Sequence, residues 1–178
     1  YEIPKRDWSS DVCSSDLNAG KVLDAASSGR SEVRSVIGSS GTSAPTGVVV
    51  YSLRDPAFLR GLADQTVGDP DRADGLTIAV PVDGTDASQG VASYRILLNP
   101  RVLDQPLGVL GRLVRHELTH ATLGSRGRGA PLWLSEGVAE YVSVQPMAPS
   151  RRRLPARALD LAATVTDLPG AEIGRAHV

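Results

Sequence analysis

Three short segments of the chain carry the hydrophobic pattern of β-strands. Residues 48–53 (VVVYSL) are β-branched and apolar, and residues 76–82 (LTIAVPV) and 92–100 (ASYRILLNP) are apolar runs between loops rich in Gly, Asp and Ser. Pro81 has no backbone N–H for a sheet ladder, so we expect residues 76–82 to lie at a sheet edge or to end there. The pattern therefore predicts a small sheet in the first part of the domain.

Helical spacing dominates the chain after position 100. Asp104-x-Pro106 is typical of a helix start and Gly124 of a helix end, which predicts one long helix between them. The apolar face of this helix consists of Leu107, Leu110, Val114, Leu118 and Ala121. Weaker patterns predict helices over residues 22–37, 55–62 and 134–142 and within 151–165. Strands followed by helices favour an α+β domain.

Both ends of the chain look like translated sequencing-adapter DNA. Residues 7–17 (DWSSDVCSSDL) match one strand of such an adapter, and residues 173–178 (IGRAHV) match its reverse complement. The preceding adapter bases begin residues 1–3, and a variable index would encode residues 4–6. We therefore expect residues 1–17 and 173–178 to be artefacts of the DNA and residues 18–172 to be a single domain cut from a longer gene.

Composition narrows the classes of function for residues 18–172. The whole chain has 19 basic and 20 acidic residues, of which the two ends hold three and four, so that 16 of each remain. A net charge near zero gives no support for a nucleic-acid partner. No apolar run approaches the roughly 18 residues of a membrane span. Cys13 lies in the adapter-like end, which excludes a disulfide scaffold or a cysteine nucleophile in the remainder.

The segment 116–120 (HELTH) of the long predicted helix carries the residues of a metal site. Residues four apart lie on one face of a helix, so His116 and His120 can direct both imidazoles at one point. Zinc prefers such nitrogen ligands, at about 2.0–2.1 Å. Glu117 is rotated by about 100° around the axis, from where it can take a proton from a zinc-bound water without binding the metal. The segment therefore predicts a zinc site with a general base.

A catalytic zinc ion requires a third protein ligand. The metzincin pattern would supply a histidine at position 126 after a glycine at 123, but the chain has Arg126 and Leu123. The following predicted helix offers two carboxylates at helical spacing, Glu136 and Glu140. One can bind the metal while the other accepts a hydrogen bond from a ligand imidazole. Helical spacing alone leaves open which carboxylate takes which role.

The segments "HELTH" and "WLSEGVAEY" together resemble the gluzincin group of zinc peptidases, most closely the peptidase MA-like family, over residues 110–142. The similar W-L-N-E-G element of the aminopeptidase N family contains the third zinc ligand, which corresponds to Glu136. The thermolysin pattern places an aspartate four residues later, beside a ligand histidine, and Glu140 takes that position. The resemblance implies His116, His120 and Glu136 as zinc ligands, Glu117 as the base and Glu140 as a partner of a ligand histidine.

The chain also departs from these patterns. The interval between His120 and Glu136 is shorter than in thermolysin or aminopeptidase N, and the exopeptidase motif G-x-M-E-N is absent, which favours an endopeptidase. No tyrosine or histidine downstream is identified as the group that stabilises the oxyanion. The implied fold is zincin-like: a small N-terminal β-sheet, then the active-site helix and a truncated helical subdomain.

The resemblance further implies a peptide or protein substrate and export from the cell, and the near-zero net charge leads us to expect no nucleic-acid partner. In such folds an edge strand lining the cleft pairs with extended substrate. We expect that strand to be the one just before the helix, with the candidate residues Ala92, Ser93, Tyr94, Arg95 and Ile96. The expected function is zinc-dependent hydrolysis of peptide bonds. The alternative is a zincin-like binding or scaffold domain without turnover.

Overall fold

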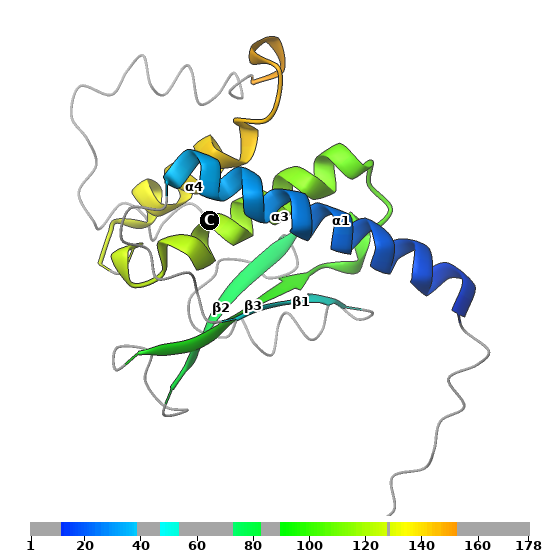
Figure 1. Ribbon diagram of the computed structural model, residues 1–178, viewed down its shortest axis with the longest axis horizontal. Helices are drawn as coiled ribbons and strands as arrows, with labels where there is room; N and C mark the ends of the chain where they lie inside the picture. The colour runs from blue at the N-terminus through cyan, green and yellow to red at the C-terminus, as the bar shows by residue number, and fades with distance from the viewer. Residues whose placement is uncertain (1–11, 39–46, 54–72, 83–89, 128, 153–178) are drawn as a thin grey trace, which may run out of the picture.

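The computed structural model describes residues 12–38, 47–53, 73–82, 90–127 and 129–152. They form an α+β arrangement, as the sequence predicts (Figure 1). Its main elements are, in chain order, α1 (Val12–Ile37), β1 (Val48–Ser52), β2 (Gly75–Pro81), β3 (Val91–Leu98), α3 (Leu107–Leu123) and α4 (Leu132–Val144), with the short 3₁₀ turns η2 (Pro100–Val102), η3 (Gly124–Gly127) and η4 (Pro149–Arg151). The helix expected over residues 55–62 and all but the first two residues of the one expected within 151–165 lie outside the described residues.

The three strands form one mixed sheet in the order β1-β3-β2. β1 runs parallel to β3, and β2 runs antiparallel to it. β2 therefore lies at an edge of the described sheet and ends at Pro81, as the proline predicts.

The prediction that residues 92–96 form an edge strand is wrong, because β3 lies between the other two strands. Tyr94, for example, is paired with Val48 on one side and with Ala79 on the other. The physical reason is burial. Ile96 and Leu98 of β3 are completely inaccessible to solvent, and an apolar strand is best shielded from water at the centre of a sheet, where it has a neighbouring strand on each side. Tyr94, Arg95 and Ile96 are paired on both sides and therefore do not offer a free strand edge to a substrate; Ala92 and Ser93 belong to the same central strand and precede its pairing with β1.

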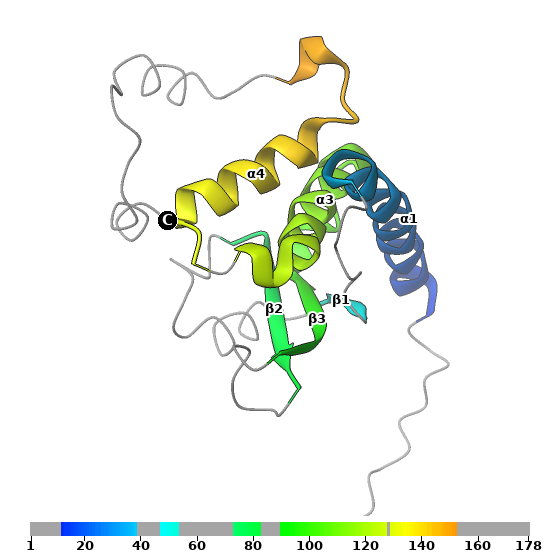
Figure 2. The same cartoon turned by 60° about the vertical axis from the view of Figure 1, so that its left-hand side comes forward.

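The described helices cover one face of the sheet. α3 lies against β2 and β3, with α1 along one of its flanks and α4 along the other (Figures 1 and 2). The core between the layers includes Val33 of α1, Ile96 of β3, and Leu110 and Val114 of α3, all fully buried. Full burial of each such side chain stabilises the fold by about 1.5–3 kcal/mol. α3 is thus held on three sides, which fixes the helix that carries the histidines.

The ends of α3 follow from local chemistry. Gly124 ends the helix as predicted: its φ is +49°, and its N–H donates to the carbonyl of His120. A Cβ at this position would lie 2.8 Å from Tyr94 Oη, so the close approach of β3 also requires glycine. At the other end Pro106 rather than Asp104 takes the N-cap position. Leu107, which the pattern places on the apolar face, is half exposed.

The other elements agree with their predicted positions to within a few residues, except α1. This helix begins at Val12 rather than Val22, so its first turns lie in the segment expected to derive from adapter DNA. Among the described helices, none has both the length and the apolar character that crossing a membrane requires.

Candidate metal centre

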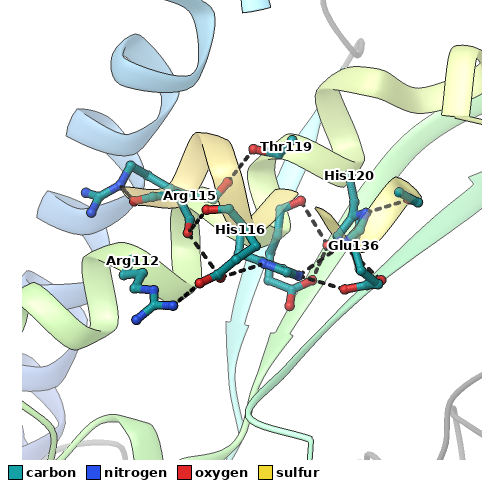
Figure 3. A network of polar contacts seen from close by, with 11 residues as sticks. Arg112, Arg115, His116, Thr119, His120 and Glu136 are labelled. Atoms are coloured by element: carbon teal, nitrogen blue, oxygen red, sulfur yellow. Dashed lines mark hydrogen bonds and ion pairs between the residues drawn. The ribbon is translucent and has the colours of Figure 1, made fainter. Parts of the chain in front are cut away.

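Two histidines of α3 and one glutamate of α4 converge on a single point (Figure 3). His116 Nε2 lies 3.2 Å from His120 Nε2 and 3.1 Å from Glu136 Oε2, and His120 Nε2 lies 3.4 Å from Glu136 Oε1. The two imidazole rings meet at an interplanar angle of 71°, with centroids 4.9 Å apart. Helical i, i+4 spacing aligns the histidines, and α4, which begins nine residues after the end of α3, brings Glu136 to face them.

This geometry fits a metal ion bound by two nitrogens and a carboxylate. Two ligands at about 2.0–2.1 Å from a tetrahedral zinc ion are about 3.3–3.4 Å apart. The two histidine nitrogens are 3.2 Å apart, and each lies at a similar distance from one oxygen of Glu136, His116 at 3.1 Å from Oε2 and His120 at 3.4 Å from Oε1. Two imidazoles with one carboxylate are also a ligand set typical of catalytic zinc. The three donor groups thus fit zinc in both chemistry and separation.

The electrostatics of the three groups favour a cation between them. Burial raises the pKa of Glu136, but the hydrogen bonds from His116 and His120 outweigh it and lower this pKa to about 2. Burial lowers the pKa of His116, yet its hydrogen bond with Glu136 and the charges of Glu117, Glu136 and Glu140 raise it on balance. The cluster therefore stabilises a positive charge, whether a proton or a divalent cation that replaces it.

Glu117 lies on another side of α3, against the sheet. The residue is only 5% exposed, and its Oε2 accepts a hydrogen bond of 2.6 Å from Thr77 Oγ1 of β2. Burial raises the pKa of this carboxyl group, while the hydrogen bond from Thr77 and the charges of His116 and His120 lower it, with a net upward shift. A carboxylate with a raised pKa, beside the two histidines of the candidate metal centre, has the properties of a general base.

Glu140 lies beside His116, but its principal partner is a different residue. Its Oε2 is 3.9 Å from His116 Nδ1, beyond hydrogen-bond distance, while Oε1 forms an ion pair with Arg112 of α3. The structure therefore brings Glu140 close to the expected position without the expected hydrogen bond. His120 Nδ1 has a different neighbour, Ser135 Oγ at 3.4 Å.

Three residues around the site were not identified from the sequence. Ser135 directly precedes Glu136, so helical spacing could have placed it near His120. Arg112 lies one turn before His116 on α3, and that spacing could have identified it as a partner for an acidic residue of α4. Thr77 is 40 residues from Glu117, and only the packing of β2 against α3 brings them together.

Comparison of the chain with protein-family models, curated proteins and solved structures finds no match.

Proposed function

We propose that this chain is a zinc-dependent peptidase domain of the gluzincin type with a zincin-like fold. His116, His120 and Glu136 would hold the zinc ion, and Glu117 would act as the general base. One observation carries the proposal: the side chains of two histidines on α3 and one glutamate on α4 converge, with potential donor atoms within 4.8 Å of one another, beside a buried glutamate on the same helix as the histidines. The sequence resemblance to the peptidase MA-like family supports the same assignment.

A bound zinc ion would supply a Lewis acid that lowers the pKa of water and polarises the carbonyl of the scissile peptide. Glu117 would accept one proton from the attacking water and deliver it to the nitrogen of the leaving amine. The carboxylate starts ionised and returns to that state, so it is not consumed. Its burial between α3 and β2 limits its motion, which favours proton transfer along one direction.

A peptide substrate is the class that the sheet favours. β2 lies at the edge of the described sheet and contacts α3, so its outer side is the strand edge nearest to Glu117. An extended peptide added there would gain main-chain hydrogen bonds beside the base. This role, expected of β3, is therefore proposed for β2.

The test of the mechanism is Glu117→Gln in the full chain. The amide keeps the size of the side chain but cannot take a proton, so we expect zinc content to stay at one per chain while cleavage of a peptide library falls by about 10²–10⁴-fold. Asp24→Asn makes the same chemical change at an exposed position of α1 and should leave cleavage unchanged.

Two outcomes would contradict the proposal. Equal cleavage by the parent and Glu117→Gln would rule out the assigned base. Stoichiometric zinc in a parent chain that cleaves no member of the library would favour the second candidate, a zincin-like binding or scaffold domain.

A further inference from the structure

The Glu117 carboxylate lies in a cradle formed by two residues of the edge strand. Gly75 and Thr77 are two positions apart on β2, so they face α3 on the same side of the sheet. Thr77 Oγ1 lies 2.6 Å from Glu117 Oε2, and a Cβ built on Gly75 would lie only 2.9 Å from Glu117 Oε1. Each carboxylate oxygen is thus set against one residue of β2.

The hydroxyl of Thr77 has a single proton and two neighbouring acceptors. The carboxylate Oε2 is at 2.6 Å and the backbone carbonyl of Glu117 at 3.1 Å. The shorter contact, to the charged acceptor, is the stronger one. Because threonine is β-branched and lies within a strand, its hydroxyl has few alternative directions. Thr77 is therefore a fixed donor that constrains one oxygen of Glu117.

Gly75 supplies the space in which the other oxygen lies. A Cβ there would also approach Glu117 Cγ to 3.2 Å, so an alanine would force the carboxylate or the strand to shift. The φ of Gly75 is not among the positive values in the described residues, so conformational freedom does not require glycine here. The close approach of Glu117 is what the absent side chain permits.

We propose that Thr77, with the space left by Gly75, is a positioning residue that orients the Glu117 carboxylate for proton transfer. This inference rests on the proposed peptidase function. It adds a role for β2 beyond substrate pairing: the strand that would hold the peptide also holds the base. The competing role for Thr77 is a purely structural tie between β2 and α3.

The experiment compares Thr77→Val, which removes the hydroxyl at constant shape, with Thr77→Ser, which keeps it. We expect Thr77→Val to lower kcat by about 10–100-fold, the scale of a misplaced catalytic group, with KM and zinc affinity within about twofold of the parent. Thr77→Ser should recover most of the loss. Thr122→Val is the matched control, because among the described residues the Thr122 hydroxyl donates within α3, to the carbonyl of Leu118.

A double variant separates positioning from a structural tie. If Thr77 acts through Glu117, adding Thr77→Val to Glu117→Gln should cause no further loss of the residual rate. If Thr77 has an independent structural role, the fold-losses of the two single variants should multiply in the double variant. A crystal structure of Thr77→Val is a test that does not depend on enzymatic activity: the Glu117 side chain should move away from β2. Gly75→Ala should displace it as well, with Gly108→Ala as a control at a glycine that has open space around it.

Unchanged kcat in Thr77→Val, or an unmoved Glu117 side chain in its crystal structure, would overturn the positioning role while leaving the peptidase proposal intact. A parallel loss of zinc, thermal stability and kcat in Thr77→Val and Gly75→Ala would show the structural tie instead. An inactive parent, or an active Glu117→Gln variant, would refute the peptidase function and this inference together.

Discussion

At the residue scale, distance separates the two candidate glutamates of α4. Both lie near His116, but a Glu136 oxygen is 3.1 Å from His116 Nε2, whereas Glu140 is 3.9 Å from Nδ1 and forms an ion pair with Arg112. The nitrogen that faces Glu136 is also the one that faces His120. Glu136 therefore lies where it could share a metal ion with both histidines, while Glu140 lies on the Nδ1 side of the His116 ring, away from that point.

The two glutamates should differ in their effect on zinc binding. Glu136→Ala removes a proposed ligand. Loss of a residue that only hydrogen-bonds to a ligand lowers metal affinity by about 10–100-fold, so we expect loss of Glu136 itself to lower zinc affinity by more than about 100-fold. Glu140→Ala should lower it by about tenfold or less, because Glu140 is beyond hydrogen-bond distance of the imidazole. Competition titration with a chromophoric chelator measures both. Equal losses, or a larger loss at Glu140, would contradict the ligand assignment.

Short-range spacing explains why part of the site could be predicted from the sequence. The i, i+4 rule brings His116 and His120 together on any helix, and helix α4 follows after a single turn. The contact of Thr77 with Glu117 could not be predicted in this way, because it depends on which strand lies under α3 and in which register. No local pattern encodes that choice.

At the element scale, a buried arginine joins the three described helices. Arg115 of α3 donates through Nε to the carbonyl of Ser143 on α4, at 2.8 Å, and through an Nη to Glu32 on α1, at 3.0 Å. Its side chain is 10% exposed, so water competes little for these bonds. Arg115 therefore helps to hold α4, and Glu136 with it, at a set distance from α3.

Replacement of Arg115 by methionine should loosen this connection. The thioether keeps most of the packing of the stem but leaves the Ser143 carbonyl and Glu32 without their donor, so we expect a loss of about 2–3 kcal/mol in the free energy of unfolding. Urea denaturation with chelator present measures it. Asp74→Asn, which weakens the exposed ion pair with Arg101, is the comparison and should cost under about 1 kcal/mol. Equal losses would refute the structural role of Arg115.

The strands show where element-scale prediction succeeds and fails. Pro81 correctly indicated a strand that ends at a sheet edge, since a missing N–H is a local property. The sequence pattern did not predict the central position of β3. Strand order depends on which apolar strand is shielded from water by a neighbouring strand on each side, and local pattern does not specify this. The apolar run at the end of β3, ending in Leu98, was the available signal.

At the scale of the whole molecule, the core and the candidate metal site are built from separate residues. The buried cluster around Leu110 and Ile96 includes none of the three proposed ligands, whose side chains lie at the boundary with solvent. Folding should therefore precede metal binding rather than depend on it, unlike in small domains that need zinc to fold.

Removal of metal should consequently leave the fold intact. After dialysis against a chelator we expect the far-ultraviolet circular dichroism to stay unchanged and the thermal midpoint to fall only by the linkage contribution of the bound ion. Addition of zinc should restore both the midpoint and cleavage. Loss of helical signal on chelation would contradict the separation of core and site.

The helices carry every proposed ligand, while the base is anchored to the sheet through Thr77. Under the proposed function, affinity for the ion would depend on the helices, whereas the rate of turnover would also depend on an edge strand of the sheet. Substitutions in a single edge strand could then abolish hydrolysis in a descendant protein that still binds zinc with unchanged affinity. A lineage of this fold could in this way pass from enzyme to metal-dependent binding protein without altering the HELTH segment.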